Sequence, residues 1–198
     1  MEKRNYQKEM ESVIDRFGGE RKRLLLHACC GPCSSYVLEY LSRYFDITIL
    51  FYNPNIHPQA EYEKRLAEQK KLISLAFSDV KLLEIGYDPA EYDAAVRGYE
   101  HLGENSERCY HCYAFRMQKA AQLAKDYDYF TTTLSISPYK NCEWVNQLGF
   151  ALEKAWGVRY LPADFKKKGG YARSVELCKM YDIYRQHYCG CRYSMEEG

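Results

Sequence analysis

The feature that most restricts the fold of this 198-residue chain is the alternation of short apolar stretches with longer helical ones. Stretches rich in leucine, β-branched and aromatic residues have the length of buried strands, and amphipathic stretches separate them. A chain that alternates in this way forms a parallel sheet covered by helices on both faces. We therefore predict an α/β, doubly wound, mostly parallel sheet whose functional crevice lies beyond the carboxyl ends of the strands.

The pattern places the expected elements along the chain. Strands are predicted at 23–27, within 46–55, at 80–88 and at 129–137, with an edge strand at 158–165. Helices are predicted at 5–17, 34–44, 59–76, around 89–99, within 103–127, at 141–156 and at 174–187. Four polar side chains or thiols then fall at the carboxyl ends of strands, namely Cys29, Cys30, Asn53 and Asn55.

The length of the chain supports one domain, 1–198, that buries a core without disulfides. The first residues are charged and lack the apolar region of a secretory signal, and no stretch is apolar enough to span a membrane. We therefore expect a cytoplasmic protein with no membrane partner. Nine cysteines in a reducing compartment favour metal ligands or redox catalysts over structural bridges.

Charge is distributed unevenly although the net charge is only +1. A basic C-terminal segment, about 159–193, carries eight Lys or Arg against three acids, which is a balance of +5. This segment could contact the phosphates of a nucleic acid, and Lys166, Lys167 and Lys168 are its densest run. A solvated loop explains the same run equally well.

Three cysteine groups carry the chemistry: Cys29-Cys30-x-x-Cys33, Cys109-x-x-Cys112 and Cys189-Gly190-Cys191. Thiolates at a helix N-terminus are stabilised by the helix dipole, which favours both nucleophilic and ligating forms. The Cys30-Gly31-Pro32-Cys33 stretch has the spacing of a thioredoxin-like loop, but the two other groups then have no role. Two pairs of thiolates suit either tetrahedral zinc or an iron–sulfur cluster.

The Cys189-Gly190-Cys191 group differs because its sulfurs are two residues apart. A disulfide across so small a ring is strained and easily reduced, and such bridges are the catalytic ones. An iron–sulfur cluster beside a redox dithiol accounts for all three groups at once. Cys142 and Cys178 have no close partner, and we expect ordinary buried thiols there.

Five motifs in order, LLLHACCGPCSS, FYNPNIHPQAEYEKR, RCYHCYAFRM, TTTLSISPYKN and YRQHYCGCRYS, resemble the QueH family of epoxyqueuosine reductases from about Asn5 to Ser194. The resemblance implies an oxidoreductase that removes the epoxide oxygen of epoxyqueuosine at the tRNA wobble position to give queuosine. It implies a [4Fe-4S] cluster on Cys29, Cys30, Cys109 and Cys112, with Cys33 as a reserve ligand. It also implies a redox-active pair at Cys189 and Cys191. A second iron is a further candidate.

The resemblance also implies a nucleotide α-hydrolase-like fold of the PP-loop (HUP) type. In those relatives a Ser-Gly-Gly-x-Asp-Ser loop after the first strand holds ATP phosphate, whereas ACCGPCSS stands here. We therefore expect metal binding in place of ATP use, with tRNA and an external electron donor as partners. The proton donor stays open among His27, His111, Asp88 and Asp164.

Two alternative functions remain at this point. A sulfur-transfer enzyme of the same fold would carry a cluster on three or four cysteines and would activate the base with ATP. A non-catalytic, zinc-stabilised RNA-binding module would use the basic segment and the tyrosines. Metal content separates the module from the reductase, because the reductase requires iron and sulfide.

Overall fold

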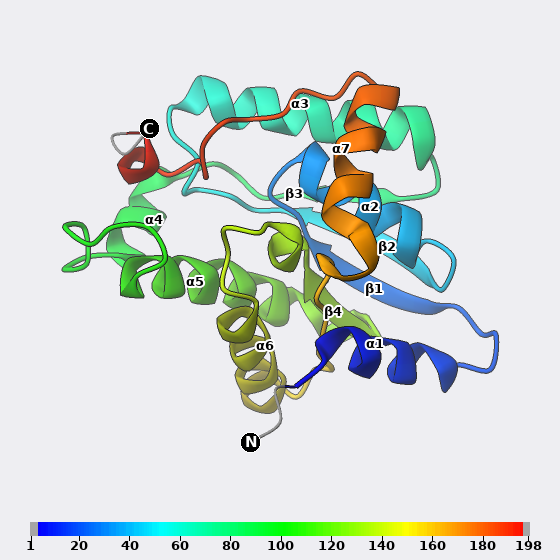
Figure 1. Ribbon diagram of the computed structural model, residues 1–198. Coiled ribbons are helices and arrows are strands. Elements are labelled where there is room, and N and C mark those ends of the chain that lie inside the picture. Colours follow the sequence, from blue (N-terminus) through cyan, green and yellow to red (C-terminus); the bar gives the residue numbers. More distant parts are fainter. Residues whose placement is uncertain (1–3, 196–198) are drawn as a thin grey trace.

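The computed structural model describes residues 4–195, in which a four-stranded sheet is flanked by helices (Figure 1). The strands are β1 (Lys22–His27), β2 (Phe45–Phe51), β3 (Lys81–Glu84) and β4 (Tyr129–Thr132), and every pair is parallel. The α-helices are α1 (Tyr6–Asp15), α2 (Gly31–Leu41), α3 (Gln59–Ala76), α4 (Pro89–Ala95), α5 (Glu107–Leu123), α6 (Cys142–Trp156) and α7 (Gly170–Met180). Short 3-10 helices are η1 (Ala124–Asp126), η2 (Thr133–Ile136), η3 (Lys167–Gly169) and η4 (Arg192–Ser194).

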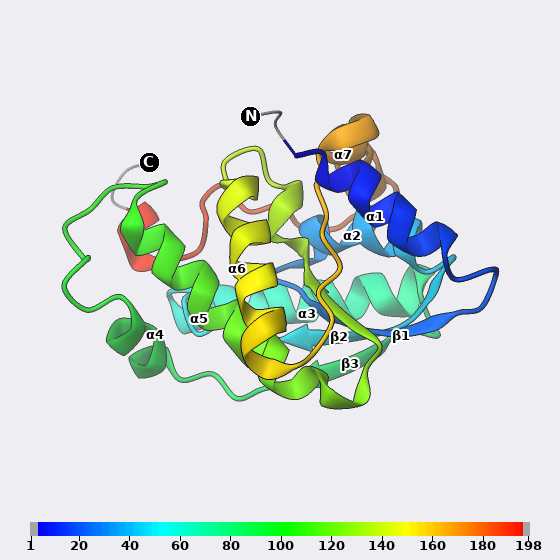
Figure 2. The same ribbon diagram turned by 90° about the horizontal axis from the view of Figure 1, so that it is seen from below.

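Side chains of β1 alternate between two apolar layers, as a strand buried on both faces requires. Leu24 and Leu26 pack in one layer with residues of α1, α2, α3 and α7. Leu25 faces the other layer, with residues of α5 and α6. Figure 2 shows α5 and α6 together on that second face. The predicted doubly wound α/β architecture is therefore confirmed.

The strand order is β3-β2-β1-β4, which matches the first four strands of the doubly wound order 3-2-1-4-5-6. This order is compatible with the predicted nucleotide α-hydrolase-like group. Strands β2 and β3 are added on one side of β1, and β4 is added on the other side. The order of the strands therefore reverses between β1 and β4, and a crevice opens beyond the carboxyl ends of these two strands. The register aligns those ends, because His27 pairs with both Leu50 of β2 and Thr132 of β4.

The predicted edge strand at 158–165 forms only a single parallel bridge, between Phe130 and Tyr160. Pro162 has no N–H to donate, which ends regular pairing. The backbone of Ala163, the residue after Pro162, forms its hydrogen bonds with the side chain of Asn146 on α6. This amide donates to the carbonyl of Ala163 and accepts from its N–H, each at 3.0 Å. The segment thus lies where it was predicted, but an amide side chain replaces part of its ladder.

The last helix ends earlier than predicted, at Met180 rather than residue 187. Asp182 has a positive φ of 50°, and Ile183 donates its N–H to the carbonyl of Cys178 at 2.8 Å. This turn closes the helix and sends the following residues across the sheet end as an extended segment. We call residues 181–191 the C-terminal strap; in Figure 1 it runs along α3 toward α4.

Other boundaries also differ from the prediction, and two of them lie next to the sheet end at which strands β1 and β4 finish. Helix α2 begins at Gly31 rather than Ser34, because Pro32 is accommodated in a first helical turn. Strand β4 ends at Thr132, where the Thr132 hydroxyl accepts the N–H of Leu134 and starts η2. Within residues 4–195, none of the helices combines the length and apolar character needed to cross a membrane.

Candidate functional site

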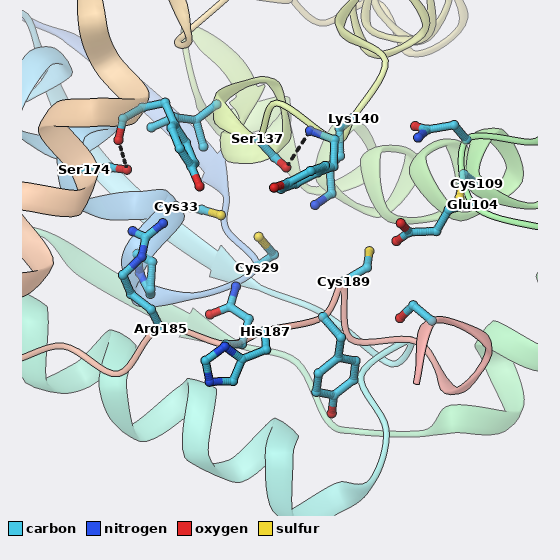
Figure 3. A pocket seen from close by; sticks show the side chains of 18 of the residues that line it. Cys29, Cys33, Glu104, Cys109, Ser137, Lys140, Ser174, Arg185, His187 and Cys189 are labelled. Carbon is cyan, nitrogen blue, oxygen red and sulfur yellow. Dashed lines mark hydrogen bonds between the residues drawn. The ribbon is translucent and has the colours of Figure 1, made fainter. Parts of the chain in front are cut away.

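A cavity of about 350 Å³ lies beyond the carboxyl ends of β1 and β4, where the sheet topology places a crevice. Its wall comes from four parts of the chain: the β1–α2 junction, the start of α5, the segment between η2 and α6, and the C-terminal strap. Figure 3 shows Cys29, Cys33 and Cys189 directing their sulfur atoms into this space. Each of the three predicted cysteine groups therefore contributes to the cavity wall: the first through Cys29 and Cys33, the second through Cys109 and the third through Cys189.

The first group sits where β1 passes into α2. Cys30 is the N-cap residue of α2, and the sulfurs of Cys29, Cys30 and Cys33 all lie within 4.8 Å of one another. Hydrogen bonds from the thiols of Cys30 and Cys33 lower the pKa of Cys29 well below its usual range. The same bonds raise the pKa of Cys30 to about 12 and that of Cys33 as well. One thiolate accepting from two thiols is a preformed ligand set.

Gly31 fixes the position of this group against the rest of the protein. A Cβ at Gly31 would stand 3.0 Å from Cγ2 of Ile183 and 3.2 Å from the carbonyl oxygen of Glu68. Any side chain there would push α2 away from α3 and from the strap. The glycine of the Cys-Gly-Pro-Cys stretch therefore permits a close approach of three segments.

The second group lies at the start of α5, where Ser106 is the N-cap residue. Cys109 lines the cavity with Cys29, while Cys112 packs deeper, in an apolar cluster with Tyr92 and Cys191. Burial raises the pKa of Cys109 and raises that of Cys112 to about 12. Without a metal, both residues are therefore neutral thiols.

The third group is held by side chains rather than by regular secondary structure. Arg65, only 2% exposed, donates to the carbonyls of Cys189 at 3.1 Å and Tyr188 at 3.3 Å. The carbonyl of Gly190 accepts the N–H of His57 at 2.7 Å, and Gly190 has a φ of 121°, which favours glycine. These contacts point Cys189 into the cavity and leave Cys191 against Cys112.

Gln186 of the strap connects the third group to the first. Its side-chain amide lies 3.1 Å from the sulfur of Cys30. All nine cysteines are free thiols, so none of the three groups is closed by a disulfide.

Two cations stand among the thiols, and the sequence analysis did not single out either. Arg116 is 1% exposed, and its NH2 atom has no hydrogen-bond partner among the described residues. Burial opposes its charge, but the negative charge that Cys112, Cys29 and Cys189 carry when they ionise raises its pKa overall. Its spacing of four and seven residues from the two α5 cysteines was a usable signal, because such positions share one helix face.

Lys140 reaches the same space from the segment before α6 (Figure 3). Burial again opposes the charge, yet the negative charge that Cys189, Cys29 and Cys33 carry when they ionise raises the pKa of this lysine above its usual value. Lys140 lies within the motif TTTLSISPYKN, but helical or strand periodicity gives it no role in a site. A buried guanidinium and a half-buried ammonium beside thiols create a site suited to an anionic group.

The four candidate proton donors do not line the cavity. His27 is fully buried and bonded to the Thr132 hydroxyl and the Tyr52 carbonyl, and burial lowers its pKa to about 4. His111 stacks on Tyr99 with ring centroids 4.3 Å apart. Asp88 caps α4, and Asp164 pairs with Lys166 at 3.1 Å.

Other predicted residues also lie apart from the cavity. Cys178 is buried in the core of the α2 face, and half-buried Cys142 donates to the carbonyl of Ala163. Asn53 donates to the carbonyl of Ala28 at 2.8 Å and so stabilises the turn after β1. Cys142 thus departs from full burial, but neither lone thiol joins the three groups.

The basic C-terminal segment is largely neutralised by acids from elsewhere in the chain. Lys168 pairs with Glu11, Arg173 with Glu39 and Arg192 with Asp93. Lys166 pairs within the segment, with Asp164. Paired charges have less to offer a phosphate, so the solvated-loop interpretation of the lysine run gains support.

Comparison with known proteins gives consistent results. The model of the family described as "Epoxyqueuosine reductase QueH" matches residues 24–197. A protein of that name from Streptococcus pyogenes is 44% identical over 98% of this chain and 79% of its own length. One from Staphylococcus epidermidis is 40% identical over 100% of this chain and 87% of its own, and one from Thermotoga maritima is 37% identical over 88% and 91%. The chain belongs to the epoxyqueuosine reductase QueH family.

Proposed function

We propose that this protein reduces epoxyqueuosine at the wobble position of tRNA to queuosine, with an iron–sulfur cluster and a redox-active cysteine pair. Membership of the family makes the chain an oxidoreductase. The observation that carries the proposal is the convergence of three cysteine groups on one cavity. Two cations, Arg116 and Lys140, lie among them and compensate negative charge.

Seven thiols are available for a metal group and a dithiol. We assign Cys29, Cys30, Cys109 and Cys112 as ligands of a [4Fe-4S] cluster, with Cys33 as the alternative to Cys30. The sulfur of Cys33 lies within 4.8 Å of the sulfurs of Cys29 and Cys30, which supports Cys33 as a ligand. The unpartnered NH2 atom of Arg116 supports an anionic occupant, because a buried guanidinium is costly without a compensating charge. When bound, such a cluster supplies single electrons, and an exposed iron is a Lewis acid for oxygen.

The reaction requires two electrons and two protons. Both C–O bonds of the epoxide break, a C=C bond forms, and the oxygen leaves as water. Closure of the Cys189 and Cys191 thiols to a disulfide releases two electrons and two protons, which balances this change. An external donor then reduces the disulfide.

The cavity contributes orientation and a partly dry environment. Cys189 faces it from the strap, and Cys29 faces it from the β1–α2 junction (Figure 3). Lys140 lies near both and stabilises negative charge on either sulfur or on the departing oxygen.

A direct test is anaerobic purification followed by metal analysis and turnover. We expect iron with acid-labile sulfide, and conversion of epoxyqueuosine to queuosine when nucleosides of digested tRNA are separated and weighed by mass spectrometry. Zinc without iron, in a protein that still binds RNA, would instead support the non-catalytic module.

A further inference from the structure

The mouth of the cavity combines exposed aromatic rings with a cation. Tyr139 is 71% exposed and Tyr171 is 37% exposed, and both line the cavity. Of the large apolar and aromatic side chains in residues 4–195, Tyr139 is the most exposed. An aromatic ring that is so little buried contributes little to the stability of the fold. An exposed ring at the mouth of a cavity instead indicates a surface that binds a ligand or another molecule.

Arg185 lines the same cavity and stands beside the Tyr171 ring. Its guanidinium carbon lies 5.7 Å from the centre of the Tyr171 ring, and its NH1 atom lies 3.5 Å from the sulfur of Cys178. Within the described part of the chain it forms no ion pair with a carboxylate, unlike Lys166, Lys168, Arg173 and Arg192. Of the basic C-terminal segment, Arg185 is therefore the cation that lines the cavity and keeps its charge for a ligand.

The size of the cavity limits what enters it. A volume of about 350 Å³ is at the small end of ligand sites and suits a single modified base. The neighbouring nucleotides of an RNA loop must then remain at the mouth. Their exposed bases meet aromatic rings, and their phosphates meet cations, which is how single strands are bound.

We propose that Tyr139, Tyr171 and Arg185 form the docking face for a single-stranded RNA loop. Tyr139 stacks on a base next to the one that enters the cavity, and Arg185 contacts a backbone phosphate. This inference rests on the proposed function for its choice of RNA, but it assigns binding to the cavity mouth rather than to the lysine run at 166–168.

The stacking is tested by binding, without turnover. The probe is a fluorescent anticodon stem-loop RNA with ordinary guanosine at the wobble position, measured by anisotropy with purified holoprotein. Tyr139→Ala should weaken binding roughly tenfold, and Tyr139→Phe should restore it because the ring face is kept. Trp156→Ala is the control. The Trp156 side chain has the same exposed fraction as Tyr171 but does not line the cavity, so this variant should bind the RNA as the wild type does.

The phosphate contact is tested by salt dependence of the same binding. Arg185→Gln should reduce the slope of log affinity against log salt by about 0.7, the value for one phosphate of a single strand. Lys167→Gln, in the lysine run, should leave the slope unchanged. The proposal is overturned if Tyr139→Ala binds like the wild type, or if only Lys167→Gln flattens the slope.

These outcomes are independent of the proposed reaction. If Tyr139→Ala weakens binding of the stem-loop but the wild-type protein does not reduce epoxyqueuosine, the proposed function is wrong and the docking face is supported. If the wild-type protein reduces epoxyqueuosine but Tyr139→Ala binds the stem-loop as tightly as the wild type, the docking face is wrong and the proposed function is supported.

Discussion

The β1–α2 junction and the C-terminal strap supply thiols to the same cavity by different means. Cys29 and Cys30 lie at the point where a central strand ends and a helix begins, so the backbone of regular elements sets their position. Cys189 lies in an irregular segment held by the side chain of Arg65 and by a bond from His57 to Gly190. We call the β1–α2 junction the fixed wall of the cavity, because it continues a strand of the sheet. We call the C-terminal strap the attached wall, because side-chain and loop contacts hold it in place.

The difference separates two tasks that the site has to perform. A metal group requires ligands that keep their geometry, which the β1–α2 junction provides through Gly31 and the three close sulfurs. A dithiol that opens and closes requires movement of its backbone. A segment with few backbone hydrogen bonds moves at lower cost than a strand end does.

The largest expected effect is at the fixed wall. Cys29→Ala should lose most of the bound iron and all turnover, because it removes the sulfur that accepts hydrogen bonds from both neighbouring thiols. Cys30→Ala, Cys109→Ala and Cys112→Ala should lose iron as well, and comparison with Cys33→Ala identifies the fourth ligand. Iron and sulfide analysis is the measurement, with Cys142→Ser as the control. Full iron in any one of these variants would remove that residue from the ligand set.

At the attached wall, Cys189→Ser and Cys191→Ser should keep iron and fold yet fail to produce queuosine over repeated cycles. A single thiol cannot close an intramolecular disulfide and so cannot deliver two electrons. Iron, sulfide and product are measured in the same preparations. Loss of iron would mean that these cysteines are ligands, which their place beside Cys109 and Cys112 makes the main alternative. Iron-replete, active variants would contradict both assignments.

The attachment itself is broken by Arg65→Met. Removing this buried guanidinium leaves Glu61 and two strap carbonyls without their donor, so the free energy of unfolding should fall by about 3 kcal/mol. Urea denaturation measures the change. Arg173→Met is the matched control, since its pair with Glu39 is partly exposed and should cost less than about 1 kcal/mol. Equal losses in the two variants would contradict the clamp.

The smallest effect is expected where the two walls touch. Gly31→Ala places a methyl group 3.0 Å from Ile183, and the overpacking should cost about 2 kcal/mol. The second substitution Ile183→Ala removes the Cγ2 atom that the new methyl group would meet, so the double variant should lose less stability than the sum of the two single losses. Urea denaturation of the single and double variants measures the coupling. Strictly additive losses would show that the walls are independent.

The fixed wall was predictable from the sequence and the attached wall was not. Residues 23–33 carry local signals for a strand that ends before the cysteines and a helix that follows them, although the predicted helix began at residue 34 and α2 begins at Gly31. The strap depends on Arg65, which lies more than a hundred residues away in the chain. Nothing near residue 189 indicates that contact, and helical periodicity led to a predicted helix up to residue 187.

Charge shows the same limit. The +5 balance of the segment 159–193 was correct as a count, but Glu11, Glu39 and Asp93 compensate it from distant positions. Likewise, Lys140 becomes part of the site only because the segment after η2 folds over the carboxyl end of β1. Pairing across the fold, rather than local composition, decides which cations face a ligand.

The side chain of Asn146 has a consequence for behaviour at high concentration. Strand β4 is the last strand in the order of the sheet, and an open strand edge invites pairing with another copy of the chain. The bridge at Tyr160, Pro162 and the amide of Asn146 together cover that edge. Gly149 lies directly beneath the Tyr160 ring, where a Cβ would stand 2.3 Å from it. Cover of this sheet edge against a second copy of the chain therefore depends in part on one amide side chain and on the absence of one methyl group.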